Sequence, residues 1–207
     1  VLTFNGGLTA TAPSGITLNG TVRTSGDTVS LGDTGASATA ITLAGTTSVI
    51  DTTNNGASGS EAGAGITLGG AIDGAADNTQ SLTLNAGTGG AIDVQSTIGA
   101  GTNTQLATLT VTQSNGATFT GAVTADTSVV LTDTTDAANI TFTGALTTPT
   151  LTTAAQGYNL KLHGNGTTIT NLFTATNTGT LELGNDVNDV LTFNGGLTAT
   201  APSGITL

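Results

Sequence analysis

The residues that could support catalysis are few and far apart. His163 is the only histidine, there is no cysteine, and two Lys and Arg residues stand against 13 Asp and Glu. One imidazole without cysteine or clustered carboxylates completes neither a zinc site nor a Ser–His–Asp arrangement. The charged residues are also too sparse for general acid–base chemistry. We therefore expect no enzyme, with His163 facing solvent in a turn and Asp133 and Asp136 forming a solvated pair.

One acidic segment has a composition suited to calcium. Gly184-Asn185-Asp186-Val187, followed by Asp189, resembles one copy of the calcium-binding nonapeptide of RTX parallel β-rolls, in which Asp side chains and carbonyl groups bind the ion. The resemblance implies Asp186 and Asp189 as calcium ligands. Because such a site needs tandem copies and the motif occurs once, we expect a charged turn and no cofactor, with calcium as the alternative.

Charge and composition exclude several kinds of partner. The formal net charge is −11, and the two basic residues, Arg23 and Lys161, lie far apart in the sequence. Nucleic-acid binding needs clustered Lys and Arg, so no nucleic-acid partner is expected. No apolar run approaches the length of a membrane-spanning helix, so we expect no membrane insertion in this segment. The absence of Cys and Met, with few Lys and abundant Thr, Gly and Asn, favours an extracellular or cell-surface protein.

Short strands separated by turns recur along the whole chain. In each, a polar residue stands between two apolar ones, which is the period-two pattern of a strand with one buried face, and Gly, Asn or Asp follows. No window has apolar residues at helical spacing. The repeated segments include LTFNGG at Leu2, ITLNG at Ile16, ITLGG at Ile66, LTVTQSNG at Leu109, ITFTG at Ile140 and LELGND at Leu181.

This pattern predicts an all-β fold of the parallel β-helix, or β-solenoid, class with essentially no helix. Two strand-and-turn segments of about ten residues each would give about nine rungs in 189 residues, whereas three-strand rungs would give about six; we favour nine. Two segments interrupt the rhythm and are expected to protrude as loops, residues 46–65 and residues 73–80.

Threonine pairs separated by one residue are frequent, as at Thr108, Thr110 and Thr112. Flat ranks of threonine on a solenoid can order water, so an ice-binding surface is one alternative function. The intervening residues are usually apolar, which predicts that they pack inward while the threonines coat the outside. The recurrence lacks a regular interval before Leu109, which argues against a lattice matched to ice.

The segment Ser81 to Thr112, SLTLNAGTGGAIDVQSTIGAGTNTQLATLTVT, resembles the repeats of bacterial surface adhesins of the filamentous-haemagglutinin and autotransporter type. The resemblance extends in composition and rhythm over nearly the whole chain. It implies a right-handed parallel β-helix in a long, exported, repetitive surface protein. It carries over no binding residue, because no receptor motif matches.

The same eighteen residues, VLTFNGGLTATAPSGITL, occupy positions 1–18 and 190–207. We interpret residues 1–189 as one solenoid period and residues 190–207 as the start of the next. The predicted function is a structural repeat of an extracellular fibre without catalysis, with an adhesin stalk that binds a cell surface or glycan as a further alternative. The expected partners are copies of the same period joined end to end, with lateral bundling of like fibres. The predicted repeat junction comprises Val1, Leu2, Phe4, Leu18, Asp189, Val190, Leu191, Phe193 and Leu207.

Overall fold

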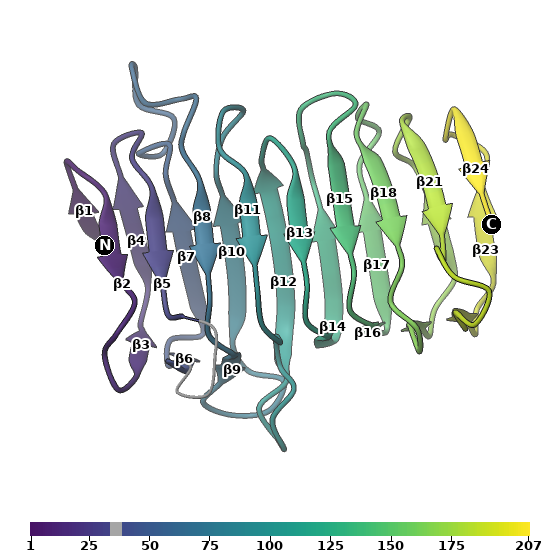
Figure 1. The fold of residues 1–207 in the computed structure, drawn as a ribbon, viewed down its shortest axis with the longest axis horizontal. Helices are drawn as coiled ribbons and strands as arrows, with labels where there is room; N and C mark the ends of the chain where they lie inside the picture. Colours follow the sequence, from purple (N-terminus) through teal and green to yellow (C-terminus); the bar gives the residue numbers. More distant parts are fainter. Residues whose placement is uncertain (34–38) are drawn as a thin grey trace.

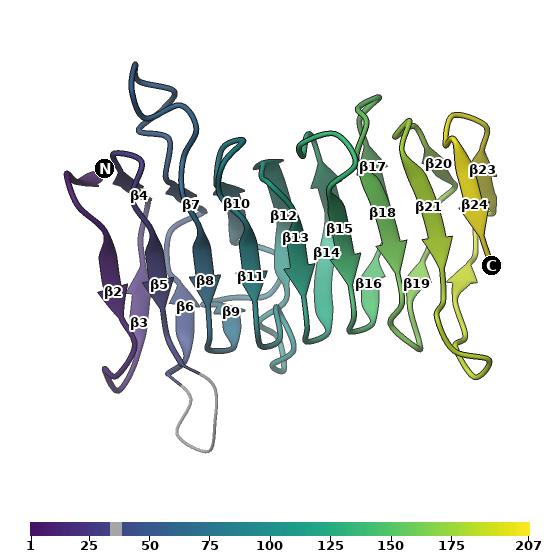
Figure 2. The same cartoon turned by 45° about the horizontal axis from the view of Figure 1, so that its top comes forward.

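The computed structural model describes residues 1–33 and 39–207, and these residues form a parallel β-solenoid. Its strands are stacked along one long axis, with the two termini at opposite ends (Figures 1 and 2). Every ladder between named strands is parallel, as at Ile66–Leu68 beside Ile92–Val94. The described residues contain no helix. The predicted all-β solenoid is therefore confirmed.

Each rung is one circuit through three faces, and strands on the same face pair from rung to rung. The first face consists of β1 (Leu2–Phe4), β4 (Thr21–Thr24), β7 (Thr47–Asp51), β10 (Ser81–Asn85), β12 (Leu106–Gln113), the second half of β14 (Val123–Leu131), β17 (Thr150–Thr153), β20 (Phe173–Ala175) and β23 (Leu197–Ala199). β17 and β20 are joined at this face by the Thr176 amide, which donates to Thr153 Oγ1 at 2.8 Å.

The second face is a continuous sheet. It consists of β2 (Leu8–Ala10), β5 (Val29–Leu31), β8 (Ile66–Leu68), β11 (Ile92–Val94), β13 (Ala117–Phe119), β15 (Asn139–Phe142), β18 (Asn159–Leu162), β21 (Thr180–Leu183) and β24 (Gly204–Thr206). Here a buried stack forms from two similar segments, FTGAV and FTGAL, because the Phe119 and Phe142 rings stack with centroids 4.7 Å apart.

The third face has the shortest strands. It consists of β3 (Ile16–Leu18), β6 (Ile41–Leu43), β9 (Ile72–Gly74), a single bridging residue at Ile98, the first half of β14, β16 (Leu146–Thr148), β19 (Thr168–Ile169) and β22 (Thr192–Phe193). The long strand β14 connects two faces, because Val123 pairs with Leu146 on the third face and Val129 pairs with Leu151 on the first.

The core is a narrow column of aliphatic side chains from alternate strand positions. On the first face Ile50, Leu84, Val111 and Leu131 stack on one another and are fully buried. Between them the polar positions point outward, as the period-two pattern predicted. At Leu109, Thr110 and Val111, for example, the two apolar side chains are buried and the threonine is partly exposed.

The number of rungs differs from the prediction. The structure has about eight rungs, each crossing three faces, where about nine rungs with two strands were favoured. The strands follow one another at shorter intervals than ten residues, as β1 at Leu2–Phe4 and β2 at Leu8–Ala10 illustrate. Loops of variable length then stretch the rungs, so that paired residues are 20 apart at Leu2 and Val22 but 34 apart at Ile50 and Leu84.

Both predicted loops are shorter than expected. Residues 47–51 form β7, in which Ile50 is fully buried, and Thr52 and Thr53 are buried as well, so the protruding part is confined to residues 54–65. Asp73 lies within β9, and the following turn begins at residue 75. The segment TSVID lacks the apolar–polar–apolar triplet typical of the other strands, which is why the sequence pattern missed it.

Candidate functional site

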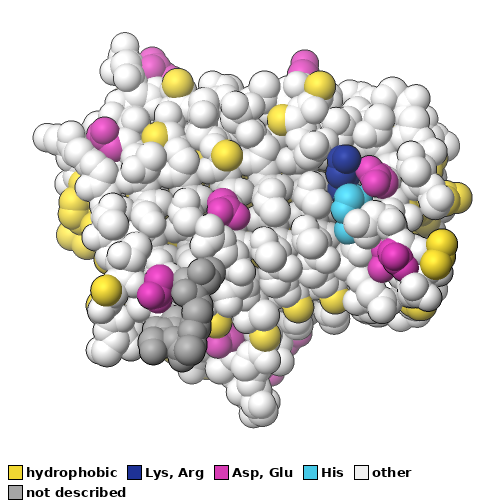
Figure 3. Space-filling view, viewed as in Figure 1, with side chains coloured by type: hydrophobic (Ala, Val, Ile, Leu, Met, Phe, Trp, Pro, Cys, Tyr) yellow, Lys and Arg dark blue, Asp and Glu magenta, His cyan; other side chains and the backbone are white. Residues whose placement is uncertain are grey.

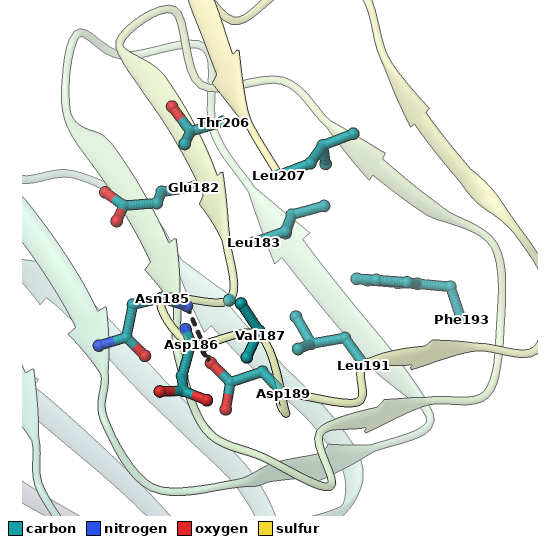
Figure 4. A pocket seen from close by; sticks show the side chains of 11 residues that line it. Glu182, Leu183, Asn185, Asp186, Val187, Asp189, Leu191, Phe193, Thr206 and Leu207 are labelled. Atoms are coloured by element: carbon teal, nitrogen blue, oxygen red, sulfur yellow. Dashed lines mark hydrogen bonds between the residues drawn. The ribbon is translucent and has the colours of Figure 1, made fainter.

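A hollow lies at the C-terminal end of the solenoid. It has a volume of about 620 Å³ and lies between the ends of the second and third faces. Figure 4 shows Leu183, Leu191, Phe193 and Leu207 directed into it, with the loop that joins β21 to β22 at its margin. Apolar side chains in this position continue the core column, so the hollow is the open end of the core.

The predicted calcium ligands lie in the marginal loop and hold that loop together. Asp189 Oδ2 accepts hydrogen bonds from the amides of Asn185 and Asp186, at 2.8 and 2.9 Å. Asp186 Oδ1 accepts from the Asn188 amide at 2.9 Å and from its side-chain Nδ2 at 2.7 Å. The two hydrogen bonds from Asn188, that from its backbone amide more than that from its side chain, lower the pKa of Asp186.

This loop therefore has a local explanation as a hydrogen-bonded turn of the Asx type. Each carboxylate already serves amides of its own loop. Over residues 1–33 and 39–207, no three His, Cys, Asp or Glu side chains are grouped so that they could hold a metal ion. Calcium binding at Asp186 and Asp189 stays a prediction that these contacts do not require.

The residues of the predicted repeat junction lie at two opposite ends of the molecule. At the N-terminal end, Val1 is 79% exposed and Leu2 is 63% exposed. At the other end, Leu207 is 91% exposed, and Val190 is exposed too. Leu18 is buried, while Phe4, Leu191 and Phe193 are partly buried against the core. The same kind of side chain that fills the core of each inner rung is thus uncovered at both ends.

The two copies of the eighteen-residue sequence occupy different faces. Phe4 pairs with Thr24 on the first face, whereas its copy Phe193 pairs with Ile169 on the third face. The other two strands of the second copy are displaced in the same direction. Leu8–Ala10 lie on the second face but Leu197–Ala199 on the first. The sequence could not reveal this displacement, because strands on all three faces carry the same alternation.

The two basic side chains are both engaged in ion pairs. Arg23 Nε lies 3.2 Å from Asp51 Oδ2, and its Nη2 donates to Asn55 Oδ1 at the base of the protruding loop. Lys161 Nζ lies 3.1 Å from Glu182 Oε2, on the neighbouring strand of the second face. The pairing with Lys161, more than the nearby imidazole, lowers the pKa of Glu182.

His163 does not lie free in solvent as predicted. Its side chain is 14% exposed, and Nε2 lies 3.1 Å from Glu182 Oε1. This contact is not visible in the sequence, because Glu182 comes from the next rung. Figure 3 shows one basic side chain, the imidazole and a carboxylate side by side on a surface that is otherwise mostly uncharged. In this cluster the Glu182 carboxylate links Lys161 and the imidazole of His163 across two adjacent strands.

The outward side of the first face carries two adjacent ranks of small hydroxyl and β-branched side chains. Register places Thr47, Ser81, Thr108, Ser128 and Thr150 in one rank, and Val49, Thr83, Thr110, Val130 and Thr152 in the other. The ranks therefore include strands that precede Leu109 in the sequence, where no regular recurrence was expected. The regular interval is hidden in the sequence, because loops between the strands differ in length.

Comparison with known proteins found no matching family, no matching curated protein and no matching solved structure. The similarity to filamentous-haemagglutinin and autotransporter adhesins is thus a resemblance of composition and rhythm. In the part of the chain that the structure describes, no helix is long and apolar enough to span a membrane.

Proposed function

We propose that this chain is a structural repeat of an extracellular fibre, built from tandem β-solenoid periods and without catalytic activity. The observation that carries the proposal is the repetition of eighteen residues at an offset of 189 positions without one substitution. A self-contained solenoid has no need of such a copy. A continuous one does, because the copy lets the next period begin with the same strands.

The exposed apolar positions at both ends support this proposal. Leu2 and Leu207 are 63% and 91% exposed, while Ile50 in the interior is fully buried. Uncovered solenoid ends also offer unpaired strand edges, which tend to pair with other chains. In the proposed fibre, the neighbouring periods cover these edges and side chains. Strength along the axis then comes from backbone ladders and the apolar column, without metals or disulfides.

Electron microscopy of the native material, with denaturing electrophoresis of the same sample, tests this proposal. One 189-residue period spans nearly eight rungs, so at about 4.8 Å per rung we expect filaments with an axial period of about 37 Å. We also expect a polypeptide far heavier than 19.9 kDa. Isolated particles with a band near 19.9 kDa would contradict the tandem fibre. Filaments that dissolve into chains of that mass would instead indicate stacking of separate subunits.

A second function, ice binding, is favoured by the two ranks on the first face. Thr108 and Thr110 stand side by side in them, and the ranks run through five successive strands, β7, β10, β12, β14 and β17. Hydroxyl and methyl groups repeat there at the rung spacing of about 4.8 Å along the axis. Ser and Val replace Thr at several positions, which makes the array less uniform than a rank of threonine alone.

The test is thermal hysteresis and ice-crystal shape at micromolar protein. An ice-binding face predicts faceted crystals, which Thr110→Lys abolishes because a long charged side chain interrupts both ranks. The matched control is Thr141→Lys, on the outward side of β15 in the second face. Round crystals and no hysteresis with the unchanged protein would exclude this function. An adhesin stalk stays a prediction of the sequence resemblance, and a separate tip domain would be its evidence.

A further inference from the structure

The displacement between the two sequence copies can be counted in rungs. On the third face, the paired positions are Ile16, Ile41, Ile72, Ile98, Val123 and Leu146, followed by β19 and β22. β22 is thus in the eighth rung, on the third face, whereas its copy β1 is in the first rung, on the first face. The sequence repeats after seven complete rungs and two further faces.

All three strands of the second copy agree with this count. β22 pairs with Thr168–Ile169 on the third face, β23 pairs with Phe173–Ala175 on the first, and β24 pairs with Thr180–Glu182 on the second. In the first copy the corresponding strands follow the order first, second, third. The displacement is therefore a property of the whole segment.

The displaced copy keeps its inward and outward pattern. Thr9 and its copy Thr198 are both exposed, while the flanking residues of each are partly buried. Phe193 stacks on Phe173, with ring centroids 6.2 Å apart, and so continues the core. A change of face is tolerated because each face offers the same environment, whereas a slip by one residue would turn Leu197 and Ala199 outward.

From this geometry, and resting on the proposed tandem fibre, we infer that each period is rotated by one face, about a third of a turn, relative to the preceding one. The open C-terminal end then receives the next period of the same chain. A second copy of Thr21–Thr24 pairs with β22, as the original pairs with β1. Its valine, the copy of Val22, stacks on Leu191 and covers the hollow beside Phe193.

The rotation determines where the surface features recur. The protruding loop of residues 54–65 would project from one corner in one period, from the next corner in the following period, and return only after three periods. At about 37 Å per period, the true repeat of the fibre is about 110 Å. A fibre of this kind presents these protruding loops in three directions, and no side stays flat along its length.

The register can be tested by disulfide formation in the 207-residue chain, which contains no native cysteine. Thr168→Cys with Thr192→Cys places two thiols on paired strands of the third face. Adjacent parallel strands are about 4.8 Å apart, within the range of Cα separations that a disulfide spans. We expect nearly complete cross-linking of this pair under mild oxidation. A sequence repeat of whole rungs would instead place Thr192 beside Thr174 on the first face. We therefore expect little cross-linking of Thr174→Cys with Thr192→Cys.

The control pair is Thr147→Cys with Thr168→Cys, one rung earlier on the same face. Cross-linking of the control and of Thr168 with Thr192 supports the displaced register. Cross-linking of the control and of Thr174 with Thr192, or of the control alone, overturns it and leaves the tandem fibre intact. Because all these threonines point outward, the variants should fold, and circular dichroism of the β-sheet verifies that they do.

The rotation itself is tested with a chain of three successive 189-residue periods ending in residues 1–18, with Ser58→Cys in each protruding loop. Gold clusters attached to these thiols should project in three directions along the axis and return to the same side every three periods. Clusters on one side, about 37 Å apart, would overturn the rotation while supporting the tandem solenoid. A chain that forms separate particles joined by irregular gaps would instead contradict the proposed fibre.

Discussion

Phe4 and Phe193 have the same place in the repeated eighteen residues but pair on different faces of the solenoid, with Thr24 and Ile169 respectively. Both rings are partly buried against the core. An identical sequence therefore satisfies the same burial requirement in two positions related by a face change. Apolar side chains alternate inward in the same way on all three faces. The sequence repeat therefore need not span a whole number of rungs.

Tyr158 is fully buried, and its hydroxyl donates to the Leu131 carbonyl at 3.1 Å and accepts from the Ala154 amide at 3.2 Å. Tyr158→Phe removes the hydrogen bonds of the hydroxyl and should destabilise the protein by about 1 kcal/mol. The loss stays small because the direct backbone hydrogen bond from the Ala154 amide to the Leu131 carbonyl remains. Tyr158→Ala also removes the ring and should cost about 3–5 kcal/mol. Urea unfolding measures both, and equal losses would show that the ring contributes nothing.

Burial also raises the pKa of Tyr158 to about 12. The folded state therefore favours the protonated phenol. Its contribution to stability is complete below about pH 10, the ordinary tyrosine value, and is lost as the pH rises through about 12. Alkaline unfolding of the unchanged protein should become less pH-dependent in Tyr158→Phe. An identical pH profile for the two proteins would contradict this.

Gly144 lies at the tight corner between β15 and β16, where an added Cβ would overlap the backbone of Gly121 in the preceding rung. Gly144→Ala should therefore destabilise the fold by about 1–3 kcal/mol through overpacking. The control is Gly6→Ala, because a Cβ at Gly6 meets no atom within 4 Å. Thermal unfolding should show a lower melting temperature for the first variant only.

Asp126 lies near Asp77, in a pair of segments joined by the hydrogen bond from Thr127 to Asn78. Burial first, and the charge of Asp77 second, raise the pKa of Asp126. Its contribution to stability is thus greatest below the ordinary carboxyl pKa and falls as the pH rises through the raised value. Asp126→Asn should raise the melting temperature at pH 7 but leave it unchanged at pH 3.

The Lys161–Glu182 pair should behave in the opposite way. Because Lys161 lowers the pKa of Glu182, the contribution of the pair is present above the ordinary carboxyl pKa and is lost as the pH falls through the lowered value. A double-mutant cycle with Lys161→Met and Glu182→Gln should give a coupling of about 0.2–1 kcal/mol at pH 7 and low salt. Coupling that persists at pH 2 would indicate a non-ionic contact.

A substitution at Asp189 tests whether the loop of residues 184–189 is a hydrogen-bonded turn or a calcium site. Asp189→Ala removes the acceptor for the Asn185 and Asp186 amides, so hydrogen exchange at these amides should become faster. We expect the same increase with calcium and with a chelator. Protection that depends on calcium in the unchanged protein, and disappears in the variant, would establish Asp189 as a calcium ligand.

The sequence by itself determined the class of fold. Apolar residues on either side of a polar one, as at Ile16 and Leu18, specify a strand with one buried face, and the Gly and Asn residues that follow specify its end. These are local properties, set by the pleat of a strand and by backbone conformations that few residues adopt. The eighteen-residue copy was likewise visible without any structure.

Tertiary structure alone decided the number of faces and which residues meet across the rungs. Loops between strands differ in length, so spacing along the chain does not show that Ser81 pairs with both Thr47 and Thr108, or that His163 lies against Glu182. All three faces share one alternation, so the pattern also cannot assign Leu2 and Leu191 to a face. The face on which each residue lies depends on the number of residues in every corner and loop between Leu2 and Leu191.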